Sequence, residues 1–495
     1  MTDVSSGPQP VLGYRGAVEL PDGVLVVVKR ECPTCTLVEP VLGQFAAALG
    51  DDLHVYCQDD PSFPSNVPQV IDDTGLEVSW QLGLTTVPTL IRVEHGKELD
   101  RLEGWLRKDW EAVTGVADLG PGLPEYRPGC GSRTVDPDIA DELAVRFKAS
   151  TLRSRRIRLA DLEDEMEAAF DRGWTDGLPV VPPTEARALR MLDGTSRAPD
   201  EVVAVVPPDL VECTVEKVAV NAVMAGCRPE YLPVVMAALE AACTDDFNAH
   251  GLLATTWFSG PMAIVNGPVA PAIGMNSGLN ALGQGNRANA TIGRALQLVI
   301  RNVGGGKPGG VDRATLGQPG KYTFCFAEDE DGSPWEPLSV ERGFPPGTST
   351  VTLFAAGGVH GLADQLSRTP ESLARSLAAS LRSVFHPKLV IGFDACLVVS
   401  PEHGRVFREA GWTKARLRQE LNELLTIDGV ELVRGAGGIS EGMAEQFRSA
   451  SLPKFRDGGL LIVHAGGKAG FFSAIISGWA SGALGSAPVT REVVG

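Results

Sequence analysis

Two cysteines spaced C-x-x-C, Cys32 and Cys35, are the residues of this sequence best suited to chemistry. The apolar run at residues 24–28 predicts a buried strand, and the apolar spacing after Cys35 predicts a helix. Cys32 is therefore expected at a helix N-terminus, where exposed N–H groups and the helix dipole stabilise a thiolate. Cys35 follows one turn later, close enough to form a disulfide. The pair could then cycle between dithiol and disulfide.

A single C-x-x-C motif is also half of a zinc site. No second C-x-x-C and no H-x3–5-H follows at zinc-finger spacing, so the sequence offers no second pair of ligands. The seven histidines are dispersed, and we expect no metal site. A Val-Pro-Thr motif at residues 87–89, followed by an apolar run, favours the redox interpretation instead.

These two motifs resemble those of the thioredoxin superfamily, over residues 11–118. The resemblance implies that Pro88 is a cis-proline facing the disulfide. It also implies that Cys32 attacks the substrate disulfide and that Cys35 resolves the mixed disulfide. It implies no cofactor beyond this redox-active disulfide. The loop reads Glu-Cys-Pro-Thr-Cys where the family has Trp-Cys-Gly-Pro-Cys, so the family's redox potential does not transfer.

A glycine- and proline-rich stretch at residues 119–135 is expected to be a linker after a first domain at 1–118. Cys130 lies within it, in the context Gly-Cys-Gly-Ser. It is either an exposed linker thiol or a third redox cysteine that a mobile tether brings to Cys32. Flanking glycines allow the close backbone approach that disulfide exchange needs. The sequence leaves both alternatives open.

Residues 136–495 are expected to form a larger α/β domain with a mostly parallel or mixed sheet, with 136–260 mostly helical and one or two lobes. Four apolar segments of this domain each run into a loop of small residues that carries a polar side chain. Open α/β sheets bind ligands at the carboxyl ends of their strands. We expect the following substrate-binding candidates near one rim: Asn266, His360, Ser400, His403 and His464.

A loop rich in Asn, Gly and Arg precedes a predicted helix and is a candidate anion site, because helix N-termini and arginines bind carboxylates and phosphates. Alternatively, its amides only satisfy the loop's own backbone. The candidate residues are Asn276, Asn280, Arg287, Asn289 and Arg294.

Cys227 closes another predicted helix and is a further candidate redox thiol, whereas most other cysteines are expected to be small core hydrophobes.

The formal charge of −18 on 495 residues argues against nucleic acid as a partner, because an acidic surface repels phosphates. No apolar run approaches 18 residues, and the N-terminus lacks the pattern of a secretion signal, so no membrane association is expected. Nine cysteines without such a signal favour a reducing compartment, and we expect a cytoplasmic protein.

Four stretches of the large domain, at residues 174–184, 276–294, 312–336 and 401–414, resemble a bacterial family found alongside proteins with a Sec/Cys-Gly-Ser-Cys motif. The resemblance implies an association with thiol or selenol chemistry and transfers no catalytic residue.

The preferred interpretation is a multidomain thiol–disulfide oxidoreductase with a fused substrate-binding or catalytic α/β domain. Its expected partners are a small-molecule or protein thiol or disulfide, an external reductase and, in a homo-oligomer, further copies of the chain. In the alternative, the large domain is a lyase or transferase for a small anionic or sulfur-containing substrate. The first domain would then only maintain or dock it.

Overall fold

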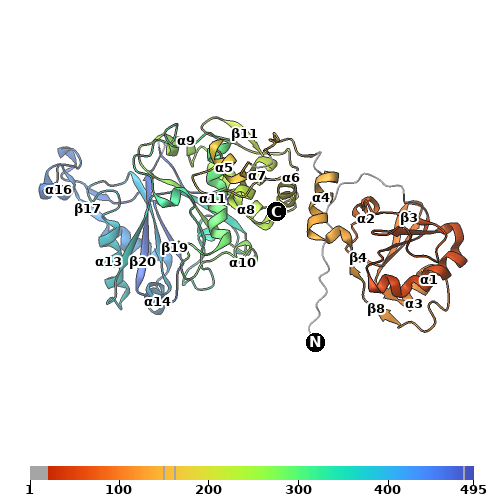
Figure 1. The fold of residues 1–495 in the computed structure, drawn as a ribbon. Helices are drawn as coiled ribbons and strands as arrows, with labels where there is room; N and C mark the ends of the chain where they lie inside the picture. Colours follow the sequence, from red (N-terminus) through yellow and green to blue (C-terminus); the bar gives the residue numbers. More distant parts are fainter. Residues whose placement is uncertain (1–19, 149–150, 161–162, 483–484) are drawn as a thin grey trace. The chain divides into compact units, whose positions relative to one another are not determined.

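The chain has the expected α/β fold, with mixed sheets in each of the two units into which it divides, Met1–Leu152 and Arg153–Gly495 (Figure 1). The computed structural model describes residues 20–148, 151–160, 163–482 and 485–495. Residues 1–19 of the predicted first domain lie outside the described residues.

A five-stranded sheet in the order β3-β2-β1-β5-β6 forms the centre of the first unit. β1, β2 and β3 are parallel, whereas β5 is antiparallel to β1 and β6. The central strand β1 is buried from its second residue on, as its unbroken apolar run predicts. The strands are β1 (Gly23–Val28), β2 (Leu53–Cys57), β3 (Val70–Asp72), β5 (Thr89–Glu94) and β6 (Lys97–Glu103). The helices are α1 (Pro33–Leu49), α2 (Glu77–Gln81), α3 (Arg107–Thr114) and α4 (Pro137–Lys148).

The stretch expected to be a linker, residues 119–135, belongs instead to the first unit. It forms two short antiparallel pairs with earlier segments: β8 (Tyr126–Arg127) with β7 (Trp105–Leu106), and β9 (Cys130–Gly131) with β4 (Thr86–Val87). α4 also belongs to this unit. The boundary therefore lies after Leu152, not at 118–135, because backbone pairing holds a sequence whose composition is typical of a loop.

The second unit contains two four-stranded sheets with the same plan, β13-β12-β14-β21 and β19-β16-β20-β15. Each has one parallel pair, followed by two antiparallel neighbours. The outermost strands are exchanged: β15 follows β14 in the chain but pairs with β20, and β21 follows β20 but pairs with β14. The strands are β12 (Gly260–Asn266), β13 (Cys325–Ala327), β14 (Thr350–Ala356), β15 (Val359–Ala363), β16 (Phe393–Val399), β19 (Leu460–His464), β20 (Phe472–Ala480) and β21 (Val489–Glu492).

The two sheets pack face to face between layers of helices. Alternate residues of β12 and β14, such as Ile264 and Phe354, share one core with Cys396 and Ile476 of the other sheet. The opposite face of the first sheet packs on α7 (Val215–Ala225), α8 (Leu232–Ala242) and α11 (Arg287–Asn302), and that of the second on α13 (Pro370–Leu381), α14 (Pro401–Glu409) and α15 (Lys414–Leu424) (Figure 1).

Shorter elements complete the unit around these layers. The helices are α5 (Glu165–Asp171), α6 (Glu185–Leu192), α9 (Ala249–Ala254), α10 (Val269–Ala272), α12 (Leu338–Glu341) and α16 (Gly429–Leu432). Two antiparallel pairs join β10 (Val202–Val206) to β11 (Val211–Thr214) and β17 (Thr426–Asp428) to β18 (Ser451–Pro453).

Candidate functional site

Cys32 caps the N-terminus of α1, directly after β1, as its place in the sequence predicts. Its sulfur accepts a hydrogen bond from the backbone N–H of Cys35 at 3.3 Å. Asp59 holds the preceding loop by accepting the N–H groups of Arg30 and Glu31 at 2.7 and 2.9 Å. The strand and the loop together fix the first cysteine at the positive end of the helix.

The Val87–Pro88 peptide bond is cis and lies beside Cys32. In its thiol form, Cys32 donates a hydrogen bond from Sγ to the carbonyl oxygen of Val87 at 3.5 Å. Val87 is also the residue that pairs with Cys130 in the β4–β9 ladder. One short segment thus brings the third cysteine to the first.

Close packing keeps β9 in this position. A Cβ added at Gly129 would lie 2.4 Å from Thr86 Cγ2 and 2.8 Å from the Val87 carbonyl oxygen, so only glycine fits there. Thr34 in the first turn of α1 donates a hydrogen bond to the carbonyl oxygen of Pro128 at 2.7 Å.

A buried side-chain network also anchors the end of β9 to the sheet. The amide of Gln58, which follows β2, donates to Ser132 Oγ and Ser79 Oγ at 2.8 Å each. Its oxygen accepts the backbone N–H of Arg133 at 3.1 Å. Because these groups are buried, breaking one bond leaves a polar atom without water.

The electrostatics of the cluster favour a thiolate at Cys32 alone. A hydrogen bond from the Cys35 thiol, which outweighs burial, and another from the Cys130 thiol lower the pKa of Cys32 to about 5. Burial and the bond to Cys32 raise the pKa of Cys35 far above its ordinary value, and the same two causes raise that of Cys130. The pKa shifts therefore favour a thiolate at Cys32 and protonated thiols at Cys35 and Cys130.

The three cysteines differ in their exposure to solvent. Cys32 and Cys35 are fully buried, whereas Cys130 is partly exposed, and all three are free thiols. Thiol–disulfide exchange needs a thiolate that reaches a second sulfur. Among these three cysteines, Cys130 has the sulfur nearest the surface, and it could be that second sulfur.

In the second unit, Asn266 and His464 lie at strand ends and meet through Glu328, which directly follows a buried strand and which the sequence offers as a possible general base. The side-chain amide of Asn266 donates to Glu328 Oε2 at 2.7 Å, and the backbone N–H of His464 donates to Glu328 Oε1 at 3.4 Å. Burial raises the pKa of Glu328. His464 Nε2 has no hydrogen-bond partner and packs against Gly404.

Ser400 and His403 lie at the next strand end, on α14. Ser400 Oγ donates to the carbonyl oxygen of Phe472, and His403 Nδ1 bonds Ser473 Oγ at 2.8 Å. Burial lowers the pKa of His403, so the imidazole stays neutral. A cavity of about 420 Å³ lies beside Ser400. His360 is exposed on β15 and is not part of this group.

The Asn- and Arg-rich loop satisfies its own backbone, which was the alternative to an anion site. Arg294 forms a two-pronged ion pair with Asp176, at 2.8 Å for both bonds, and Arg287 donates to the carbonyl oxygen of Gly226 at 2.9 Å. The amides bond neighbouring backbone groups in the same way: Asn276, Asn280 and Asn289. Both guanidinium groups are engaged within the fold, Arg294 by a carboxylate and Arg287 by a carbonyl oxygen, which favours the alternative over the predicted arginine clamp.

Cys227 does not have the environment of a reactive thiol. It is buried behind α7, and its thiol donates to the carbonyl oxygen of Thr291 at 3.3 Å. Burial raises its pKa to about 12, so the thiolate is rare near neutral pH. The redox role expected for Cys227 is not supported by this site.

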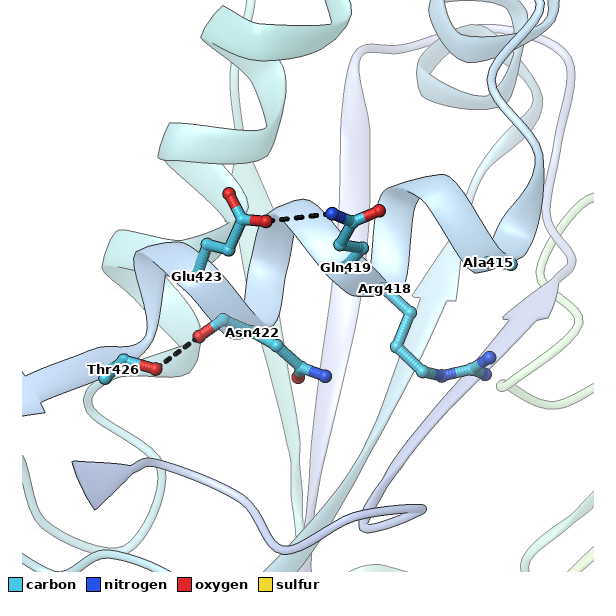
Figure 2. Close-up of a pocket in the computed structure, with 6 residues that line it drawn as sticks. All are labelled: Ala415, Arg418, Gln419, Asn422, Glu423 and Thr426. Carbon is cyan, nitrogen blue, oxygen red and sulfur yellow. Dashed lines mark hydrogen bonds between the residues drawn. The ribbon is translucent and has the colours of Figure 1, made fainter. Parts of the chain in front are cut away.

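A hollow on the exposed face of α15 carries no convergent chemistry. In Figure 2, Gln419 donates to Glu423 at 3.0 Å and Thr426 donates to the carbonyl oxygen of Asn422. Arg418 is ion-paired with Glu341. In the described part of the chain, no group of three or more His, Cys, Asp or Glu residues is placed to hold a metal ion. Within those same ranges, no helix has the length and apolar character needed to cross a membrane.

No protein-family model and no curated protein sequence matches this chain.

Proposed function

We propose that the first unit is a thioredoxin-like module that carries out thiol–disulfide exchange at Cys32. The observation that carries this proposal is the position of Cys32: its sulfur caps the N-terminus of α1, accepts the Cys35 backbone N–H and lies beside a cis-proline, next to the β4–β9 pair that contains Cys130. The mixed sheet and the C-x-x-C position directly after its central strand support it further.

The chemistry starts with a substrate disulfide, R–S–S–R′. The Cys32 thiolate attacks one sulfur, the substrate S–S bond breaks, and R′ leaves as a thiolate that takes a proton from the medium. A second cysteine then loses its proton and attacks Cys32 Sγ, which releases R as a thiol. The substrate gains two electrons and two protons, and the protein holds one new disulfide.

Either Cys130 or Cys35 would act as the second cysteine. Cys130 is partly exposed, whereas Cys35 is fully buried, so Cys130 loses its proton to solvent more easily. We therefore place Cys130 before Cys35 in the sequence of steps. Cys35 then attacks Cys32, frees Cys130 as a thiol and leaves a Cys32–Cys35 disulfide, which an external dithiol reduces.

A redox titration of the full chain tests the proposal. The protein is equilibrated in dithiothreitol buffers of graded potential, and its free thiols are trapped and mapped. We expect a reversible two-electron couple that involves Cys32 and disappears in Cys32→Ser. Cys243→Ser, in the other unit, serves as the matched control and should leave the couple unchanged.

A titration in which Cys32 stays a thiol at every potential would overturn the proposal. Loss of the couple in the Cys243→Ser control would do so as well, because it would place the redox centre elsewhere.

A further inference from the structure

A cavity of about 580 Å³ opens in the second unit, at the start of β12 rather than at its carboxyl end. The second half of α11, helix α9 and the loop at residues 306–322 form its walls. Its volume lies within the range of about 300–1,000 Å³ that is typical of small-molecule sites. None of the rim residues expected from the strand ends lines it.

Three buried hydrogen-bond donors in this cavity have no acceptor. They are Gln297 Nε2, Arg301 Nε and Gln318 Nε2. A buried donor without a partner costs about 1–3 kcal/mol, so a fold rarely keeps three in one cavity. A ligand that carries oxygen acceptors would satisfy them.

The donors converge because of where the chain places them. Gln297 and Arg301 are four residues apart on α11 and therefore share one face of the helix. A Cβ added at Gly260 would lie 3.4 Å from Gln297 Nε2 and 3.2 Å from Lys321 Cγ, so those side chains meet above bare backbone. Gln318 uses its amide oxygen to accept the Gly320 N–H, which leaves Nε2 as its unpaired end.

One positively charged side chain of the cavity has no carboxylate partner. Lys321 pairs with Asp312 at 2.9 Å, and Asp176, which also lines the cavity, pairs with Arg294. Arg301 has no carboxylate partner among the described residues. One unpaired guanidinium favours one negative charge, and its planar fork fits a carboxylate.

Apart from Ser259 and Tyr322, the rest of the lining is apolar, with Phe247, Leu252, Leu253, Pro261 and Ile300 as its main side chains. A small inorganic anion would bind the charged group but would leave this apolar surface in contact with water. We propose that the cavity binds a small organic monocarboxylate with an apolar body, whose carboxylate lies at Arg301 and the two glutamines. This site is independent of the thiol chemistry of the first unit.

The test uses hexanoate as the probe and the full-length protein, with affinity measured by saturation-transfer NMR. We expect hexanoate to bind the wild type at least tenfold more tightly than the neutral hexanamide. Arg301→Gln should remove that difference. Arg313→Gln, which deletes the same charge from an exposed side chain of the same loop region, should keep it.

Gln297→Ala provides a second variant in case Arg301→Gln does not fold, which circular dichroism and thermal melting would reveal. It should weaken hexanoate binding severalfold and leave hexanamide binding nearly unchanged. The proposal is overturned if hexanoate does not bind the wild type or binds no better than hexanamide. It is equally overturned if hexyl phosphate binds more tightly than hexanoate, or if Arg313→Gln weakens hexanoate binding as much as the cavity variants.

Discussion

Cys32 and Cys227 are both buried cysteines at the end of a helix, yet their chemistry is opposite. Cys32 stands at a helix N-terminus, and bonds from two thiols help lower its pKa to about 5. Cys227 follows a helix C-terminus, donates to a carbonyl oxygen and has a pKa raised to about 12 by burial. Hydrogen-bond donors outweigh burial at Cys32, whereas burial prevails at Cys227, and this balance separates the two pKa values.

The largest effect that tests this contrast comes from removing each sulfur in turn. Cys32→Ser should reduce exchange with oxidised glutathione to the rate seen without protein, because no other described thiol has a lowered pKa. Cys227→Ser should leave the rate unchanged. Equal losses in the two variants would erase the distinction between the sites.

Gly129→Ala is expected to expose Cys32 by forcing β9 away from β4. The added methyl group would meet Thr86 and the Val87 carbonyl oxygen, at a cost of about 1–3 kcal/mol. Cys32 should then react with iodoacetamide about 5- to 160-fold faster, if the whole penalty favours local opening of β9. Gly131→Ala is the control, since its new methyl would lie 3.8 Å from Val135. Matching rates in both variants would contradict the covering role of β9.

Removing the Cys130 donor should move Cys32 toward the behaviour of Cys227. In Cys130→Ala, the pKa of Cys32 should rise above its value of about 5, as measured by thiolate absorbance against pH. A pKa that stays constant or falls would show that the Cys130 thiol does not bond the Cys32 thiolate.

The same pKa difference predicts how stability depends on pH. The folded pKa of Cys32 lies below the ordinary thiol value of about 8.5, so the thiolate stabilises the reduced protein fully above pH 8.5. This contribution is lost as the pH falls toward 5. Denaturant titrations of the reduced wild type and Cys32→Ser should therefore differ more at pH 8.5 than at pH 5. A difference that does not change with pH would contradict the assignment.

The smallest expected effect concerns the anchor of β9. Ser132→Ala removes the hydroxyl that accepts from Gln58 and should cost about 1 kcal/mol locally. Alkylation of Cys32 should quicken severalfold, whereas Ser65→Ala, which removes an exposed hydroxyl bonded to Glu39, should have no effect. An unchanged alkylation rate in Ser132→Ala would show that the Gln58–Ser132 hydrogen bond does not hold β9 in place.

The sequence predicts the local parts of the cysteine site well. An apolar run at residues 24–28 followed by C-x-x-C is a short-range signal, and β1 and α1 form as it indicates. β9 could not be predicted in the same way. It has two residues, one of them glycine, and its pairing depends on the chain returning to Val87 from about forty residues away.

Long-range pairing also limited the prediction for the second unit. The sequence indicates its buried strands, but the exchange of β15 and β21 between sheets leaves no local pattern. Arg301, near the end of a predicted helix, looks like a residue that offsets the helix dipole. Only the fold brings it to Gln318, and only the ion pair of Arg294 with Asp176 shows that the more obvious arginine is engaged.

We propose above all that Cys130 forms a disulfide with Cys32, and the Cys35→Ser variant tests this proposal most directly. The reduced variant is oxidised mildly with diamide, digested without reduction and analysed by mass spectrometry. The account predicts an intramolecular Cys32–Cys130 disulfide that is absent when Cys130 is also replaced by serine. Recovery of Cys32 as a free thiol, or in a disulfide with another molecule while Cys130 stays reduced, would contradict it.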